Sequence, residues 1–178
     1  NAYDMWGLSI SPDGKSLVYR FSSREAERLY VQNLDKGSVR SLGSDINNPS
    51  WSPDGKTIAA RYINYALEQQ IVLMNPNGSN RRIIVKDKAN FLYSPAWSPD
   101  GKQIAFVRFE KRKNVYIVDA DGKNERFVTE GDCPAWSPDG KTLAITREIF
   151  GREYGQYEVY FVNPDGSNQR LFTYKSNR

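Results

Sequence analysis

The pentapeptide Ser-Pro-Asp-Gly-Lys occurs four times in the 178-residue chain, and this recurrence constrains the fold more than any other feature. The copies lie at residues 11–15, 52–56, 98–102 and 137–141, so their spacings are 41, 46 and 39 residues. A period of this length indicates a chain built from similar structural units stacked side by side. We therefore take the repeat, and not the whole chain, as the unit that folds.

Each repeat is expected to contain four short strands. A Trp precedes three of the pentapeptides, at Trp51, Trp97 and Trp136, whereas Ile10 fills this place in the first copy. In each repeat one apolar, β-branched run follows the pentapeptide, a second run precedes a later Gly-containing turn, and a third run follows that turn. Pro-Asp-Gly between apolar runs is typical of a tight turn, since Pro presets φ, Asp accepts backbone amides and Gly tolerates positive φ. No segment shows a sustained helical period.

Four antiparallel strands in each unit of about 42 residues are typical of propeller blades. The pattern Pro-x-Trp-Ser-Pro-Asp-Gly-Lys, followed by a strand and a second Asp/Asn-Gly turn, resembles the WD40-like Pro-Asp repeat of TolB-type β-propellers. We therefore predict an all-β protein, a single β-propeller domain over residues 1–178. Its four blades are expected at about 3–44, 45–90, 91–130 and 131–174.

Ring closure is the open question, because members of the resembled family usually have six or more blades. Three arrangements are compatible with the sequence: a compact four-bladed ring, pairing with a second copy, or a segment of a longer propeller. An open stack would expose apolar faces and strand edges at its two ends. Because all four repeats are intact, we expect a self-contained ring. If one chain does not close the ring, we expect a homo-oligomer.

The loops that differ between repeats are predicted to form the binding face. The loops between second and third strands, and the connections between repeats, vary strongly and lie at the same edge of each sheet. Arg and aromatic side chains in these loops suit protein interfaces, because they combine a large contact area with a polar tip. The candidate binding residues are Arg24, Tyr65, Phe91, Tyr93, Arg112, Phe150, Arg152 and Tyr154.

Other recurring residues are predicted to be structural. We expect Trp51, Trp97 and Trp136 to pack between blades. The turn aspartates should accept backbone amides and not bind metal; these are Asp13, Asp54, Asp100 and Asp139. An Arg also recurs near the end of each second strand, at Arg20, Arg61, Arg108 and Arg147. By the alternation of strand side chains the four need not share one side, and salt bridges between blades are favoured over a cationic ring.

Composition excludes several chemistries. The chain has no His, which removes Ser-His-Asp and Cys-His nucleophile systems and the usual zinc sites. The single Cys, Cys133, lacks a visible base and is expected to be a buried small side chain. We therefore expect no catalytic residues, no metal and no cofactor. The net charge of +4 is not gathered in a Lys/Arg block, so no nucleic-acid partner is expected, and no apolar run is long enough for membrane insertion.

We interpret the chain as a non-catalytic TolB-like scaffold that binds protein, and not as an enzyme. Two alternatives stay open: an accessory propeller of a larger enzyme such as a prolyl-oligopeptidase-like peptidase, and a propeller that binds a carbohydrate or small ligand. The family resemblance implies a periplasmic or otherwise extracytoplasmic location.

Overall fold

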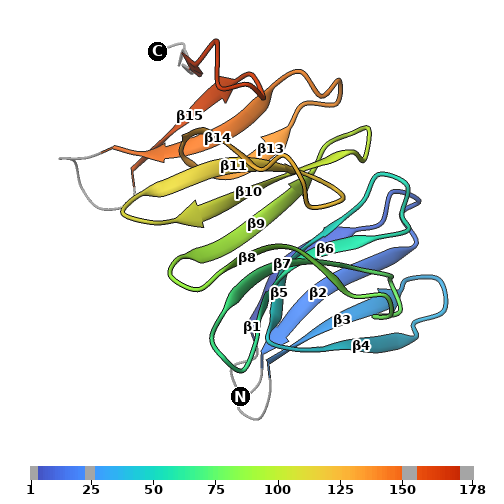
Figure 1. Ribbon diagram of the computed structural model, residues 1–178. Coiled ribbons are helices and arrows are strands. Elements are labelled where there is room, and N and C mark those ends of the chain that lie inside the picture. The colour runs from blue at the N-terminus through green and yellow to red at the C-terminus, as the bar shows by residue number, and fades with distance from the viewer. Residues whose placement is uncertain (1–3, 23–26, 150–155, 173–178) are drawn as a thin grey trace.

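The protein is an all-β stack of four sheets, which confirms the predicted propeller fold (Figure 1). The computed structural model describes residues 4–22, 27–149 and 156–172. Within these residues each sheet contains four antiparallel strands in chain order. Each sheet is one blade, and the blades are numbered 1 to 4 along the chain. The described residues contain no helix that is long and apolar enough to cross a membrane.

The strands of each blade follow the apolar runs of one repeat. Blade 1 contains β1 (Asp4–Ile10), β2 (Ser16–Ser22), β3 (Glu27–Asn33) and β4 (Val39–Ser44). Blade 2 contains β5 (Ile46–Trp51), β6 (Ile58–Ile63), β7 (Gln69–Met74) and β8 (Arg82–Asp87). Blade 3 contains β9 (Phe91–Trp97), β10 (Gln103–Phe109), β11 (Lys113–Asp119) and β12 (Arg126–Glu130). Blade 4 contains β13 (Asp132–Trp136), β14 (Leu143–Glu148), β15 (Tyr157–Val162) and β16 (Arg170–Leu171).

The pentapeptide forms the same hydrogen-bonded turn in every blade. In blade 2 the Ser52 hydroxyl donates to Asp54 Oδ1 at 2.6 Å, and the Lys56 amide donates to the same oxygen at 3.0 Å. These bonds, the hydroxyl first, hold the pKa of Asp54 below its ordinary value. Equivalent bonds engage the other three turn aspartates, Asp13, Asp100 and Asp139. The four carboxylates are therefore occupied within their own turns.

A bulge interrupts the first strand of each blade. Three residues before the Trp position the backbone has a positive φ, between 49° and 57°, at Gly7, Asn48, Ser94 and Cys133. The pairing with the second strand shifts register at these places. Cys133 is exposed, so the expectation of a buried side chain is wrong. The bulge explains the exposure of Cys133, because the extra residue departs from the regular alternation of side chains between the two faces of the sheet.

The hydrophobic core is divided into three clusters, and each cluster joins two blades that are consecutive in the chain. Blades 1 and 2 share the cluster around Leu29 and Ile58, blades 2 and 3 the one around Phe106, and blades 3 and 4 the one around Ile145. Blades 2 and 3 therefore each bury one face against the preceding blade and the other against the following blade. Stability on this plan comes from the interfaces between neighbours.

Each of Trp51, Trp97 and Trp136 also forms a hydrogen bond across its interface. The indole nitrogen Nε1 donates to a backbone carbonyl of the preceding blade, one residue before the Trp position of that blade. The acceptors are Ser9 for Trp51 at 3.2 Å, Ser50 for Trp97 at 3.2 Å and Ala96 for Trp136 at 3.1 Å. This recurrence shows that one contact geometry is used three times.

Glycines of the two turns lie directly against the preceding blade. A Cβ placed on Gly101 would lie 3.4 Å from the ring of Pro53, and one on Gly166 would lie 2.6 Å from the carbonyl oxygen of Val128. Gly166 has φ +86°, a conformation that favours glycine. The turns of blades 2, 3 and 4 thus fit closely over the pentapeptide Pro and the last strand of the blade before them.

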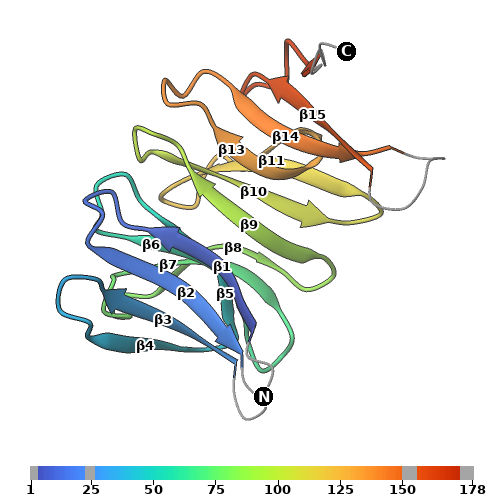
Figure 2. The same ribbon diagram turned by 180° about the vertical axis from the view of Figure 1, so that it is seen from behind.

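The four described blades form an open arc, and blades 1 and 4 lie at opposite ends of it (Figures 1 and 2). No core cluster among the described residues joins blade 4 to blade 1. The expectation of a ring closed by this one chain is therefore wrong. The reason is geometric: the rotation between neighbours is set by their close packing, and three such steps do not bring the fourth blade back to the first.

Candidate functional site

A groove of about 800 Å³ opens between blades 3 and 4. It lies at the edge of the sheets that carries the loops between second and third strands and the connections between blades, which we call the loop face. In Figure 1 this edge is on the left for blades 3 and 4. The blade 3–4 groove is lined by Phe109, Lys111, Arg112, Lys113, Phe127, Thr129, Glu130, Gly131, Asp132, Thr146, Arg147, Glu148, Tyr157, Glu158, Tyr160 and Gln169.

Exposed aromatic rings provide the apolar part of the groove. Phe109 ends β10, Phe127 lies in β12 and Tyr157 begins β15, and all three side chains are exposed. Large apolar side chains exposed together around a concavity favour contact with another molecule, because covering them removes apolar surface from water. The two strand-end rings, Phe109 and Tyr157, flank the loops that differ most between repeats.

Ion pairs provide the polar part. Arg112 Nη1 lies 3.0 Å from each carboxylate oxygen of Glu130, and Lys113 Nζ lies 2.8 Å from Asp132 Oδ2. The bond to Asp132 is the main cause that raises the pKa of Lys113, and the amine also lies 5.7 Å from the centre of the Tyr157 ring. Two cations of the groove, Arg112 and Lys113, are therefore paired with carboxylates of the same surface.

Arg147 connects the two blades that form the groove. Its Nε donates to the carbonyl of Glu130 at 2.8 Å, and its Nη2 donates to Thr129 Oγ1 at 2.5 Å and to Gln169 Oε1 at 2.6 Å. The guanidinium carbon also lies 4.3 Å from the centre of the Tyr160 ring. One side chain of blade 4 is thereby fixed to the last strand of blade 3, so the two walls of the groove are rigidly related.

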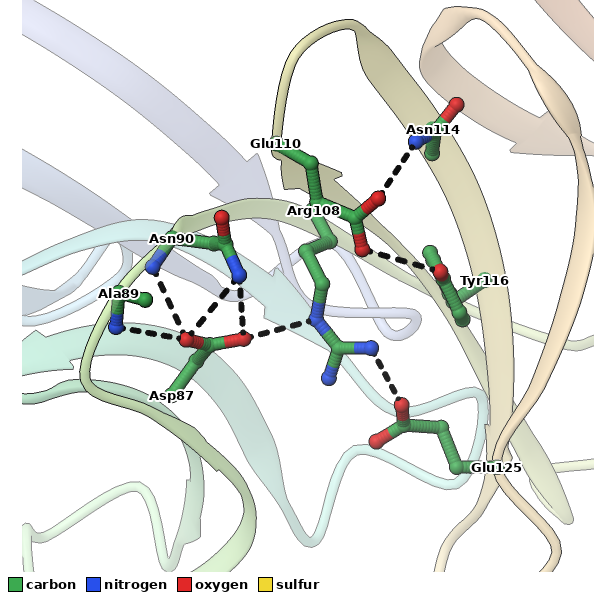
Figure 3. Close-up of polar contacts among 8 residues, drawn as sticks. All are labelled: Asp87, Ala89, Asn90, Arg108, Glu110, Asn114, Tyr116 and Glu125. Atoms are coloured by element: carbon green, nitrogen blue, oxygen red, sulfur yellow. Dashed lines mark hydrogen bonds and ion pairs between the residues drawn. The ribbon is translucent and has the colours of Figure 1, made fainter.

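The recurring arginines divide into two pairs, as the alternation of strand side chains requires. Arg20 and Arg61 come five residues after their pentapeptide Lys, whereas Arg108 and Arg147 come six residues after it. The second pair therefore points to the opposite side of the sheet, toward the preceding blade. Arg108 Nε lies 3.1 Å from Asp87 of blade 2, and Nη1 lies 2.6 Å from Glu125 (Figure 3).

No ring of arginines results from this arrangement. Figure 3 shows Asp87 also accepting bonds from the amides of Ala89 and Asn90, beside the loop that leads to β9. Asp87 and Arg108 form the interblade salt bridge that the sequence favoured. At blades 1 and 2 a smaller cavity of about 330 Å³ lies beside Arg20 and Arg61, but Arg20 pairs with Glu27 and Arg61 donates to Gln69.

The predicted binding residues are only partly brought together. Arg112 lines the blade 3–4 groove. Tyr65 is fully exposed in the loop between β6 and β7, and Phe91 is exposed at the start of β9, 5.9 Å from the Arg61 guanidinium. Burial, followed by the nearby charge of Asp132, raises the pKa of Tyr93 to about 12. The remaining candidates lie outside the described residues; they are Arg24, Phe150, Arg152 and Tyr154.

The prediction missed Phe109, Phe127 and Tyr157. All three lie in segments that the sequence predicts to be strands, whereas the binding residues are predicted from the loops and the connections between repeats. The available signal was position, since Phe109 and Tyr157 are end residues of strands that border variable loops. Arg147 is one of the recurring arginines, but its bonds to blade 3 depend on the close approach of two sheets, which the sequence of one strand does not specify.

Although Cys133 is exposed as a residue, neighbouring atoms partly desolvate its thiol, and this desolvation, followed by the charge of Asp132, raises the pKa of the thiol. Among the residues that the structure describes, no cluster of three or more His, Cys, Asp or Glu could hold a metal ion. The groove presents aromatic surface, paired charges and backbone groups.

Comparison with known proteins agrees with this architecture. The family model for the TolB beta propeller domain matches residues 60–177. No curated protein matches the chain in sequence. Among solved structures, TolB from Acinetobacter baumannii is 21% identical, with a TM-score of 0.80, over 96% of this chain and 43% of that one. A putative TolB from Agrobacterium tumefaciens is 25% identical, with a TM-score of 0.79, over 98% of this chain and 64% of that one.

The same fold occurs in proteins described as enzymes. An oligogalacturonate lyase in complex with manganese is 17% identical, with a TM-score of 0.72, over 96% of this chain and 54% of that one. At this identity the likeness shows the fold alone. The chain spans less than two thirds of the length of each of these three proteins.

Proposed function

Because the chain belongs to the TolB beta propeller domain family, we propose that it is a non-catalytic scaffold that binds a protein partner through its loop face. The blade 3–4 groove is the principal contact in this proposal. The single observation that carries it is the combination, in one rigid concavity, of exposed aromatic rings with charged groups that are already paired. Family membership further suggests an extracytoplasmic location.

A protein segment suits this surface better than the other partner classes. Aromatic side chains and Arg dominate the energetics of protein interfaces, and here Phe109, Tyr157 and Arg112 border one groove. A nucleic acid would require an excess of cations to neutralise phosphates, whereas Lys113 and Arg112 have carboxylate partners. Fixation of the walls by Arg147 limits the conformational entropy lost on binding.

The proposal is tested by selecting random displayed peptides on the immobilised chain and measuring the affinity of the selected peptides for two variants. Phe109→Ser with Tyr157→Ser removes the two strand-end rings of the groove. The control Leu34→Ser removes an exposed apolar side chain of the opposite edge. A hot-spot aromatic contributes about 2 kcal/mol, so we expect the groove variant to bind at least about tenfold more weakly and the control to bind like the unmodified chain.

Selected peptides that bind the groove variant and the unmodified chain equally would contradict the proposal. Displacement of the peptides by oligosaccharides, but not by other peptides, would favour the carbohydrate-binding alternative. Retention of the circular-dichroism spectrum by the groove variant ensures that a loss of affinity reports on the surface, since both side chains are exposed in the fold.

A further inference from the structure

A pocket of about 330 Å³ opens at the loop face between blades 1 and 2. Arg20 and Glu27 of blade 1 line it, together with Asn47 and Arg61 of blade 2. Every described residue of its lining belongs to these two consecutive blades, so the pocket lies between blades inside the arc and not on an outer face of it. We call it the blade 1–2 pocket.

Two arginines at equivalent positions of this pocket have different partners. Arg20 Nε lies 2.5 Å from Glu27 Oε1, so the charge of Arg20 is paired. Arg61 Nε and Nη2 donate to Gln69 Oε1 at 2.9 and 2.7 Å. Glu27 and Gln69 occupy the same place, since each begins the third strand of its blade and pairs with the residue two positions after the Arg. The carboxylate of blade 1 is thus replaced by a neutral amide in blade 2.

The charge of Arg61 is not paired within the part of the chain that the structure describes, because no carboxylate there lies within ion-pair distance of it. Burial is the main cause that lowers the pKa of Arg61, while the nearby charge of Glu27 raises it and that of Arg20 lowers it. The lining contains two arginines and one carboxylate, so positive charge is in excess. A half-buried cation in this state favours an anion as its partner, since desolvation of an unpaired charge is unfavourable.

Asn47 adds an unpartnered acceptor to the same pocket. Its side chain is only 9% exposed, and its Oδ1 has no hydrogen-bond partner among the described residues. Asn47 and Arg61 pair directly across β5 and β6, so their side chains lie on the same side of the sheet. A buried amide oxygen without a donor is unfavourable, and an N–H group of a bound molecule would satisfy it. The pocket therefore combines a site for an anion with a site for an N–H donor.

We infer that the blade 1–2 pocket binds a carboxylate of a peptide segment, with Arg61 contacting the carboxylate and Asn47 Oδ1 accepting a neighbouring backbone N–H. The inference rests on the proposed function, because it takes the partner to be a protein. The bonds to Gln69 use the Nε–Nη2 edge of the guanidinium, and among the described residues Arg61 Nη1 forms no hydrogen bond. The Nη1–Nη2 edge suits the two oxygens of a carboxylate.

A peptide carries both of the groups that the pocket matches. A carboxylate at a chain end or on an Asp side chain lies a few bonds from a backbone N–H, so one residue can reach Arg61 and Asn47 together. A phosphate group supplies the charge but no N–H beside it. The peptide carboxylate is therefore the ligand that uses both unpartnered groups of the pocket.

The test is a titration of the ¹⁵N-labelled chain with small probes, followed by NMR. N-acetylglycine carries a carboxylate beside an amide N–H, whereas N-acetylglycinamide lacks the charge. N-acetylglycine should shift the Arg61 Nε and Asn47 side-chain signals saturably, and the neutral amide should bind at least about tenfold more weakly. N-acetyl-aspartate N-methylamide carries its carboxylate on a side chain, so the tighter of the two charged probes distinguishes a chain end from an acidic side chain.

Two isosteric substitutions change only the charge at the equivalent positions. Gln69→Glu gives Arg61 the kind of partner that Arg20 has, so N-acetylglycine should bind at least about tenfold more weakly. Glu27→Gln removes the partner of Arg20, so binding should become tighter. The control Arg40→Gln alters the net charge by the same amount as Gln69→Glu, at an exposed residue of β4, and should bind like the unmodified chain. If Gln69→Glu loses its circular-dichroism spectrum, Arg61→Gln replaces it, with the same expected weakening.

Absence of a saturable shift at Arg61 would overturn the inference, as would equal affinity of Gln69→Glu and the unmodified chain. Binding of methyl phosphate as tight as that of N-acetylglycine would also overturn it, because the N–H would then contribute nothing. The outcomes are separate from those of the scaffold proposal. Peptides that depend on the blade 3–4 groove, without any effect of N-acetylglycine on Arg61, would contradict the carboxylate pocket alone. Specific N-acetylglycine binding by a chain that selects no peptide would contradict the scaffold proposal and leave the carboxylate site in place.

Discussion

The glycines of the second turn provide a graded test of how closely the blades pack. Gly78, Gly122 and Gly166 occupy equivalent positions, with φ of +85°, +88° and +86°. A Cβ would lie 3.5 Å from a side-chain atom of Leu42 at Gly78, 3.2 Å from the carbonyl oxygen of Ile84 at Gly122, and 2.6 Å from that of Val128 at Gly166. Substitution of these glycines by Ala therefore varies the distance between the new Cβ and the preceding blade, while the backbone conformation stays nearly constant.

The expected cost has two parts. Positive φ costs an Ala roughly 1–2 kcal/mol relative to Gly, and this part is shared by all three positions. Overpacking against a neighbouring element adds about 1–3 kcal/mol where the obstacle is backbone that cannot rotate away. Gly166→Ala should therefore lose about 2–5 kcal/mol of unfolding free energy, Gly78→Ala only the first part, and Gly122→Ala an intermediate amount.

Urea unfolding followed by Trp fluorescence measures these differences, because Trp51, Trp97 and Trp136 all lie at blade interfaces. An extra loss of about 2 kcal/mol shifts the midpoint by about 1 M urea at a typical slope. Equal losses for Gly78→Ala and Gly166→Ala would refute the close packing of the fourth blade on the third. A reversed order would refute the equivalence of the three interfaces.

Two further predictions concern single contacts between blades. Trp97→Phe should lower the unfolding free energy by about 1 kcal/mol, because the bond to the Ser50 carbonyl is lost, and an unchanged urea midpoint would contradict this role. Burial alone would raise the pKa of Asp87, but bonds from Ala89 and Asn90 and the charge of Arg108 lower it below 3.8. The stability that ionised Asp87 contributes is present above pH 3.8 and is lost as the pH falls through the folded pKa. The unfolding temperature of Asp87→Asn should therefore depend less on pH between about pH 5 and pH 3 than that of the unmodified chain. An identical pH dependence of the two proteins would contradict this role of Asp87.

The sequence predicted the blade but not the arrangement of blades. Turn residues and strand periodicity act within about ten residues, and the four pentapeptides therefore located the hairpins and the interblade Trp positions. The curvature of the arc depends on packing between sheets, such as Gly166 against Val128, which no local pattern reports. The same limit applies to the groove. The variability of its loop indicates Arg112 as a candidate, whereas Phe109 and Tyr157 line a groove that exists only where blades 3 and 4 pack together.

The groove itself is tested most directly by hydrogen–deuterium exchange of the chain with and without a selected peptide. The strand β11 begins at Lys113, whose carbonyl accepts a hydrogen bond from the Gly131 amide at 2.8 Å, and both residues line the groove. Binding at this site predicts slower amide exchange at residues 110–113 and 130–132, with the pentapeptide turns at 98–102 and 137–141 unchanged. Slower exchange confined to those turns, or no change at the groove for a peptide that binds, would contradict a loop-face scaffold.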